Sequence, residues 1–392
     1  MTATITEGVW AEVIGQPAAV AELQAAVADG AAMTHAWLFT GPPGSGRSVA
    51  ARAFAAALQC PDGGDGTCHA CHTVLAGTHA DLVVINPEGL SIGVDEAREI
   101  VRVAARAPSQ GRWQIILVED ADRMTEGAAN AVLKMIEEPP PRTVVMLCAP
   151  SLHPDDVSVT IRSRCRVIAL HTPGADAIAD VLVRRDGVDA ALAAWAARAS
   201  GGHVGRARRL ARDEEARMTR KAVLDVPLSI VSLAACLEAA ESLVGAADEE
   251  TGAVTGTRDA AELEALKNSL GVGARGPGVV AASRGSAGQI KELERRQKVR
   301  AKRVGRDSLD RALVDLAGLY RDAMVLASTP SGTLPLNHPD RRTDAEELGR
   351  RIGPEGALQR IEAVLQCRAA LEQNVKPQVA LEALTVRLRL PG

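Results

Sequence analysis

Two hydrophobic patterns alternate along the first 170 residues of the chain. Short, continuous apolar runs are typical of strands that are buried on both faces of a sheet. Between these runs, residues 94–107 and 127–138 carry apolar side chains at helical spacing, and the second segment stops at a run of prolines. The alternation predicts a parallel sheet covered by helices, and so an α/β domain over residues 1–170. The predicted strands are Ala36–Thr40, Leu82–Asn86, Gln114–Glu119 and Thr143–Ala149.

The rest of the chain has only helical patterns. Residues 171–212 are short, alanine-rich segments, which predict a small helical domain after the sheet. Residues 213–392 predict a second, all-helical domain. Within it, Gly, Ala, Ser, Thr and Pro accumulate and apolar periodicity weakens over residues 245–288. We therefore expect a flexible insertion at 245–288.

A strongly basic segment, residues 289–306, follows this expected insertion. It has only two acidic residues, Glu292 and Glu294, and no aromatic residue that could stack on a base. Two interpretations stay open: a solvated helix face, or a site that attracts a phosphate backbone or an acidic partner. The basic residues are Lys291, Arg295, Arg296, Lys298, Arg300, Lys302, Arg303 and Arg306.

Charge and hydropathy exclude several classes of protein. The 392 residues carry a formal net charge of −4, which argues against a surface built as a whole to coat nucleic acid. No segment approaches the roughly 20 apolar residues of a membrane helix. The opening residues also lack the basic start and apolar run of a signal peptide. We therefore expect a cytoplasmic protein without membrane contact.

The segment from the first strand into the next helix has the spacing of a phosphate-binding loop. Glycines let the backbone turn so that its N–H groups converge on an anion, and the helix N-terminus adds partial positive charge. Ser48 would supply a hydroxyl to Mg²⁺, but Arg47 stands where a lysine normally reaches the terminal phosphates of ATP. Its planar guanidinium is not an equivalent replacement. We therefore expect weak or absent ATP turnover, and leave ATP binding open. The predicted nucleotide-binding residues of the loop are Gly41, Pro42, Pro43, Gly44, Ser45, Gly46, Arg47 and Ser48.

The complementary half of such a site should follow another strand. Residues 114–118 form an apolar run that ends in Glu119 and Asp120. In P-loop ATPases an acidic residue here holds Mg²⁺ and its neighbour orients water. The usual order is Asp-Glu, so the inverted pair changes the reach of both side chains. This departure also predicts poor hydrolysis.

Three of the seven cysteines, Cys60, Cys68 and Cys71, lie within twelve positions. Seven cysteines are too few for a disulfide scaffold in a chain of this length. Their clustering favours a metal site over a disulfide.

Several motifs of the first 170 residues resemble one family. Asn130–Pro140 (NAVLKMIEEPP) and Thr160–Cys165 (TIRSRC) resemble the signatures of bacterial clamp-loader subunits in the AAA+ superfamily. Cys68–Cys71 (CHAC) with Ala76–Asp81 (AGTHAD) narrows the resemblance to the delta-prime family of DNA polymerase III. Val13–Gln16 (VIGQ) is similar to the opening segment of that family, beside its adenine pocket.

The resemblance implies three domains: an AAA+ P-loop domain, a helical lid at 171–212, and a helical collar at 213–392 that assembles with other subunits. The implied partners are the clamp-loader subunits delta and gamma/tau, with the sliding clamp and primed DNA met through the assembled loader. The resemblance also implies that Arg164 is an arginine finger and that Ser151 is a nucleotide sensor. Gly205 takes the place of the second sensor arginine, and Arg206 lies one position further along.

Members of the family bind structural zinc through four cysteines. By this resemblance Cys68 and Cys71 fill the last two positions, Cys60 could be the first ligand, and Asp65 falls where another cysteine is expected. The fourth ligand stays open among Asp65, His69 and His72. The alternative is three reduced thiols without a metal.

Three departures from the family pattern indicate poor hydrolysis by this chain: Arg47, the inverted pair Glu119-Asp120, and Gly205. A subunit that keeps a trans-acting arginine but loses its own hydrolytic residues serves a neighbour's site, which is the delta-prime role within the holoenzyme. The first alternative is an active, gamma-like motor ATPase of the same complex. A P-loop kinase or other small-molecule NTPase is less favoured, because the motifs at 130–140 and 160–165 would stay unexplained.

Overall fold

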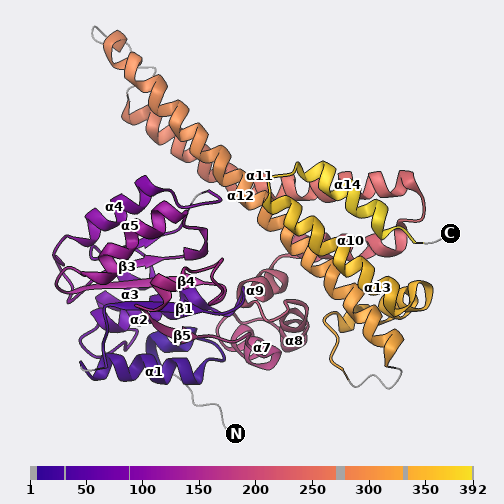
Figure 1. The fold of residues 1–392 in the computed structure, drawn as a ribbon, viewed down its shortest axis with the longest axis horizontal. Coiled ribbons are helices and arrows are strands. Elements are labelled where there is room, and N and C mark those ends of the chain that lie inside the picture. Colours follow the sequence, from indigo (N-terminus) through magenta and orange to yellow (C-terminus); the bar gives the residue numbers. More distant parts are fainter. Residues whose placement is uncertain (1–6, 31, 88, 271–278, 330–333, 391–392) are drawn as a thin grey trace. The chain divides into compact units, whose positions relative to one another are not determined.

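The computed structural model describes residues 7–30, 32–87, 89–270, 279–329 and 334–390, with the side chains of 279–287 excluded. The chain divides into two compact units, Met1–Arg212 and Asp213–Gly392, which are described separately below. Figure 1 shows the sheet in the first unit and only helices in the second.

The first unit contains a five-stranded parallel sheet with the order β2-β3-β4-β1-β5. The predicted fold class is confirmed, although the apolar pattern missed β5. That strand is short and lies at the sheet edge, where most of its side chains stay exposed or half-buried, so it lacks a continuous apolar run. The strands are β1 Ala36–Thr40, β2 Leu82–Ile85, β3 Gln114–Val118, β4 Thr143–Ala149 and β5 Arg166–Ala169.

Helices cover both faces of this sheet (Figure 1). One face packs Trp37 and Phe39 of β1 against Phe54 of α2, and the other packs Leu38 and Ile116 against α4 and α5. Because successive side chains of a strand point to opposite faces, the central strands β1, β3 and β4 are buried at every position. The helices of the sheet domain are η1 Gly8–Glu12, α1 Pro17–Ala28, α2 Arg47–Gln59, α3 His69–Leu75, α4 Val94–Ala104, η2 Ala121–Arg123, α5 Glu126–Glu137 and α6 Val159–Arg162.

Three short helices complete the first unit after the sheet. They are rich in alanine, and Asp189 caps the second of them by accepting hydrogen bonds from the amides of Ala191 and Leu192. They are α7 Ala175–Arg184, α8 Ala190–Ala199 and α9 Val204–Arg212.

The described residues of the second unit form helices and connecting loops, without a strand. Its core packs Leu316, Leu319 and Tyr320 of α12 against α10, α11, α13 and α14. The helices are α10 Glu214–Ser229, α11 Leu233–Ser269, α12 Val279–Ser328, η3 Pro339–Arg341, α13 Arg342–Glu372 and α14 Pro377–Leu388.

The segment 245–288, where a flexible insertion was expected, is helical over 245–269 and 279–288. Helix α11 continues to Ser269 and α12 begins at Val279, while residues 271–278 lie outside the described residues. Core residues end at Ala247 on α11 and resume at Leu309 on α12, so the intervening segments pack mainly on each other. Apolar periodicity is weak there because a two-helix pair has little core to fill, not because the chain is irregular.

None of the helices in the described part of the chain combines the length and hydropathy that a bilayer span demands.

Candidate functional site

The predicted phosphate loop lies between β1 and α2. Gly44 and Gly46 have φ angles of 86° and 91°, which favour glycine, and Gly46 caps the N-terminus of α2. A Cβ atom on Gly44 would lie 2.6 Å from Cα of His203, just before α9, so this position also needs a residue without a side chain. Gln16 donates hydrogen bonds to the carbonyls of Ser45, at 3.2 Å, and His171, at 2.6 Å. The loop is thereby tied to the segment that follows β5.

The side chain of Arg47 folds back onto its own loop. Its guanidinium donates a hydrogen bond to the carbonyl oxygen of Gly41, at the start of the loop. The hydroxyl of Ser45 is buried and has no hydrogen-bond partner among the described residues. The loop therefore has the backbone shape of an anion site, while its one guanidinium is held by a loop carbonyl.

Glu119 lies at the end of β3, as predicted, but its carboxylate is already engaged. Arg52 of α2 donates from Nε and Nη2 to Oε1, at 3.1 and 2.9 Å, and Asn86 donates to Oε2 at 3.2 Å. The side chain of Glu119 is only 11% exposed. Arg52 is a functional residue that the motifs did not indicate, although an arginine in the interior of the alanine-rich α2 is a signal for a buried partner.

Asp120 follows in the left-handed region at φ 55° and begins η2. Its carboxylate lies 3.7 Å from Nε of Arg123. Burial raises the pKa of the nearby Asp122, and the charge of Asp120 raises it further. The two acids after β3 therefore have different partners: Glu119 is held by Arg52 and Asn86, and Asp120 lies in a looser ion pair with Arg123.

Ser151 follows β4 and takes part in a local turn. Its hydroxyl donates to Oδ2 of Asp156 at 2.5 Å and accepts from the amide of His153 at 2.9 Å. Gly205 is exposed in the first turn of α9, and the amide of Arg206 donates to Nδ1 of His203 at 3.2 Å. The sensor roles implied for Ser151 and Gly205 stay predictions.

Arg164 lies between α6 and β5, with 39% of its side chain exposed. Its Nε lies 2.8 Å from Oε1 of Glu137, the last residue of α5. Its Nη1 donates to the carbonyl of Thr160 at 3.0 Å. The two motifs that carry the family resemblance, at 130–140 and 160–165, thus meet in one ion pair. The guanidinium thus has partners on Glu137 and Thr160 and stays partly open to solvent.

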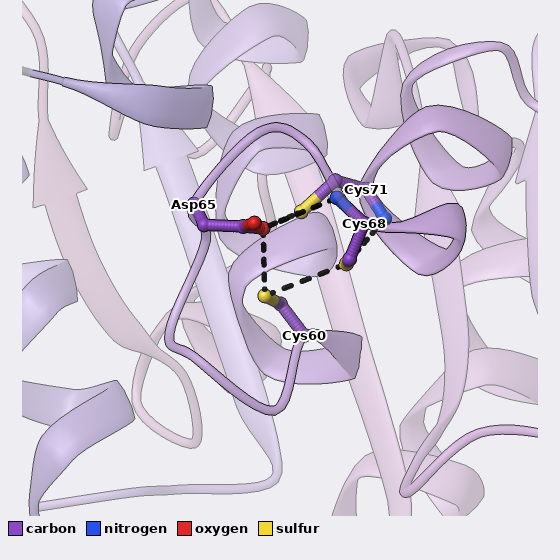
Figure 2. Close-up of side chains that lie close together, drawn as sticks. All are labelled: Cys60, Asp65, Cys68 and Cys71. Carbon is purple, nitrogen blue, oxygen red and sulfur yellow. Dashed lines mark hydrogen bonds between the residues drawn. The ribbon is translucent and has the colours of Figure 1, made fainter.

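Four of the predicted metal ligands lie together between α2 and α3 (Figure 2). The ligand atoms of Cys60, Asp65, Cys68 and Cys71 all lie within 4.8 Å of one another. Sγ of Cys60 is 3.6 Å from Sγ of Cys68 and 3.2 Å from Oδ1 of Asp65, and Sγ of Cys71 is 3.4 Å from the same oxygen. Burial raises the pKa of the Cys71 thiol well above its usual range.

These separations fit the edges of a tetrahedral metal site. With Zn–S near 2.3 Å and Zn–O near 2.0 Å, tetrahedral geometry requires S···S separations of about 3.8 Å and S···O separations of about 3.5 Å. Among the alternatives left open, Asp65 is the residue whose side chain joins the three cysteines. His69 and His72 are not in the cluster that the described residues form.

The cluster is packed onto the sheet domain rather than left as a free loop. The amide of Val9 in η1 donates to the carbonyl of Gly64 at 3.1 Å, and a Cβ atom on Gly8 would lie 2.1 Å from that carbonyl. Cys68 caps α3 by accepting from the amide of Cys71 at 3.4 Å. The loop that carries the ligands is therefore held at its middle, by η1, and at its C-terminal end, by the cap of α3.

Asp81 fixes the chain after the cluster. Its buried carboxylate accepts hydrogen bonds from the amides of Ser109, Gln110 and Gly111 at 2.6, 2.7 and 2.6 Å, and from the Ser109 hydroxyl at 2.8 Å. Burial alone would raise the pKa of Asp81, but the amide hydrogen bonds outweigh it and lower the pKa to about 2. Asp81 is the last residue of the motif Ala76–Asp81, and the motif alone does not predict this role.

Comparison with known proteins finds relatives of residues 15–174, which lie within the first unit. Residues 15–174 match a family model described as DNA polymerase III, delta subunit. The delta-prime subunit of Pseudomonas aeruginosa DNA polymerase III is 39% identical over 156 residues, which are 38% of this chain and 47% of the relative. Residues 15–174 form a domain of the delta-prime type.

The delta-prime domain is also similar to gamma/tau subunits. The DNA polymerase III gamma/tau subunit of Mycobacterium tuberculosis is 35% identical over 160 residues, 40% of this chain and 27% of the relative. The chain spans less than half the length of these two curated relatives. A gamma-subunit-related DNA polymerase III protein of Thermotoga maritima overlays with a TM-score of 0.39 at 15% identity, covering 94% of this chain and 98% of the other. That agreement is too loose to support an inference.

Proposed function

We propose that the chain is a clamp-loader subunit of the bacterial replicative DNA polymerase III. In this role it acts as a stator, and Arg164 enters the ATP site of a neighbouring subunit as an arginine finger. The observation that carries the proposal is the pairing of Arg164 with Glu137 at 2.8 Å, which holds a part-exposed guanidinium in a fixed place. A guanidinium supplied in trans stabilises the charge that spreads over the transferring phosphoryl group, and such fingers contribute about 10³- to 10⁵-fold in other enzymes.

The proposal also includes weak or absent ATP turnover at the chain's own loop. The loop could hold phosphate through its backbone, but an Mg²⁺ ion there would have to compete with Arg52 and Asn86 for the Glu119 carboxylate. The guanidinium of Arg47 is engaged with Gly41 rather than free to meet a terminal phosphate. Both contacts support weak or absent turnover at this loop, and whether the loop binds nucleotide stays open.

The proposed partners are the delta and gamma/tau subunits, contacted through the collar at 213–392. Through the assembled loader the chain would meet the sliding clamp and primed DNA. Hydrolysis in the neighbouring subunit, aided by Arg164, would then be coupled to loading of the clamp onto primed DNA.

The cluster of Cys60, Asp65, Cys68 and Cys71 is proposed to hold structural zinc. Three thiolates and one carboxylate satisfy the preference of Zn²⁺ for four ligands, and a closed site of this kind stabilises a loop that has little core of its own. The ion would join the end of α2 to the start of α3.

The stator proposal is tested by DNA-stimulated ATP turnover in the complete loader, reconstituted with clamp and primed DNA. Arg164→Ala should lower turnover at least 100-fold, whereas the matched control Arg162→Ala on the same segment should leave it within twofold. Arg162 donates to the carbonyl of Leu152 at 3.1 Å and has no proposed role in catalysis. Unchanged turnover with Arg164→Ala would contradict the proposal.

A gamma-like motor ATPase is the second candidate, favoured by the 35% identity to the gamma/tau subunit of Mycobacterium tuberculosis. The two candidates differ in the activity of the isolated chain. A motor subunit hydrolyses ATP at its own loop, so turnover by the isolated chain that is abolished by Ser48→Ala would favour the motor over the stator.

A further inference from the structure

The two-helix arm of the second unit carries a line of cations that the proposed function does not use. We define the arm as residues 248–269 of α11 and 288–306 of α12, which lie beyond the core residues of both helices. Figure 1 shows these two helices side by side and extending past the other helices of their unit.

Polar contacts fix how the two helices of the arm face each other. The guanidinium of Arg300 lies 2.5 Å from Oδ1 of Asp259 and also pairs with Glu262, and its side chain is only 10% exposed. Gln297 donates to the carbonyl of Asp259 at 2.8 Å. The face of α12 that carries Gln297 and Arg300 is therefore turned toward α11.

Four exposed cations lie on the opposite face of α12: Lys291, Arg295, Lys298 and Lys302. At about 100° per residue, they fall within a sector of about 60° that lies roughly opposite Arg300. We call this line the basic stripe. With a rise of about 1.5 Å per residue, it is about 16 Å long.

The charges of the stripe are partly offset by two exposed acids of the same helix, Glu292 and Glu294, which leaves an excess of positive charge. Arg295 forms a fork with Glu292 at 2.8 and 2.6 Å, and no ion pair joins Lys291, Lys298 or Lys302 to any residue that the structure describes. The acids that compensate the buried Arg300 lie on the α11 side, at Asp259 and Glu262. The arm thus separates its charges and turns positive charge outward.

From this geometry we propose that the basic stripe binds the phosphate backbone of duplex nucleic acid without reading its sequence. A straight line of evenly spaced cations on a rigid helix matches a linear polyanion, and phosphate contacts carry no sequence information. Residues 289–306 contain no aromatic residue, which disfavours a base-stacking platform. Binding here does not depend on the role proposed for Arg164.

The test measures binding of the isolated full chain to a fluorescein-labelled duplex of about 30 base pairs by anisotropy, a length that exceeds the stripe several times. A triple variant, Lys291→Gln with Lys298→Gln and Lys302→Gln, is compared with a control of the same net charge. The control replaces Lys221, Lys376 and Arg184, which are exposed residues outside the arm, by glutamine.

Four phosphate contacts predict that the affinity of the parent chain falls about 100-fold between 50 and 200 mM salt. The triple variant should bind at least tenfold more weakly at 50 mM salt, with a salt slope smaller by about 3. The control and an unrelated duplex sequence should behave like the parent. Equal loss in the triple variant and the control would overturn the proposal, as would tighter binding to labelled poly-glutamate than to duplex, which would indicate an acidic protein partner instead.

Discussion

The buried carboxylate of Asp81 gives a prediction whose size follows from the structure. Asp81→Asn keeps the shape of the side chain and replaces one oxygen by an NH₂ group. That group would face amides of Ser109, Gln110 or Gly111, which now donate to Asp81 at 2.6 to 2.7 Å. At least one buried N–H would lose its acceptor. At about 1–3 kcal/mol for each unsatisfied group, we expect a loss of at least about 1–3 kcal/mol in the stability of the first unit.

The stability that Asp81 contributes depends on pH. Folding lowers the pKa of Asp81 from 3.8 to about 2, so the ionised carboxylate stabilises the folded state. This contribution, about 2.4 kcal/mol, is fully present above about pH 5 and is lost as the pH falls through the unfolded toward the folded pKa. Between pH 6 and pH 3 the expected loss is about 1 kcal/mol. The amide of the Asp81→Asn variant does not titrate, so the stability difference between the two proteins should shrink by that amount.

Urea unfolding followed by tryptophan fluorescence measures this difference. The four tryptophans, at positions 10, 37, 113 and 195, all belong to the first unit, so the signal reports that unit alone. Asp95→Asn is the matched control, because the Asp95 side chain is 98% exposed. Effects of acid that both proteins share, such as protonation of the metal ligands, cancel in the comparison. A gap between parent and Asp81→Asn that is the same at pH 6 and pH 3 would refute the assigned role of the hydrogen bonds.

Three further predictions address the metal cluster, the arm and the ion pair of the finger. Elemental analysis of the purified chain should find about one zinc ion per chain. Cys68→Ser should remove this zinc, and Cys148→Ser, which replaces a buried thiol outside the cluster, should retain it. A parent chain without stoichiometric zinc contradicts the site. Arg300→Met leaves Asp259 and Glu262 without their shared cation, so amide exchange in the arm should accelerate at least tenfold while the core stays protected, and uniform exchange rates would count against the role of this contact. Glu137→Gln should lower loader turnover severalfold relative to Glu138→Gln, since Glu137 holds Arg164; equal turnover in both variants would argue against positioning.

The sheet was predictable from the sequence because its strands are buried on both faces. A strand such as β4, with every residue buried, leaves an apolar run that cannot be mistaken for a loop. The edge strand β5 leaves no such run, because it pairs on one side only and exposes Ala169. Strand recognition by hydrophobicity therefore fails first at the edge of the sheet.

In the arm, apolar periodicity underestimates a helix rather than a strand. The weak apolar periodicity of residues 245–269 predicts a flexible segment, yet these residues form part of α11. Helix formation there depends on local hydrogen bonds and on pairing across the arm, such as the contact of Arg300 with Asp259. A helix that packs against a single partner needs few apolar residues, so periodicity alone underestimates it.

For the candidate site, the motifs located the residues but not their partners. The spacing of the cysteines placed Cys60, Cys68 and Cys71 in one cluster, and the structure brings Asp65 to them. The engagement of Glu119 by Arg52 could not be read from the sequence, because the two residues are 67 positions apart and meet only when α2 packs on β3. Such long-range pairs decide whether the side chains around a loop with the right spacing are available to bind Mg²⁺ and phosphate.

The stator function is tested most directly by comparing the DNA-stimulated ATP turnover of two variants in the same reconstituted loader, with clamp and primed DNA present. Ser48→Ala removes the hydroxyl from the chain's own loop, and Arg164→Ala removes the proposed finger. If the chain is a stator, Ser48→Ala leaves DNA-stimulated ATP turnover within twofold of the parent, and Arg164→Ala lowers it at least 100-fold. The reverse pattern, with turnover lost in Ser48→Ala and kept in Arg164→Ala, would contradict the stator function and show that the chain hydrolyses ATP at its own loop.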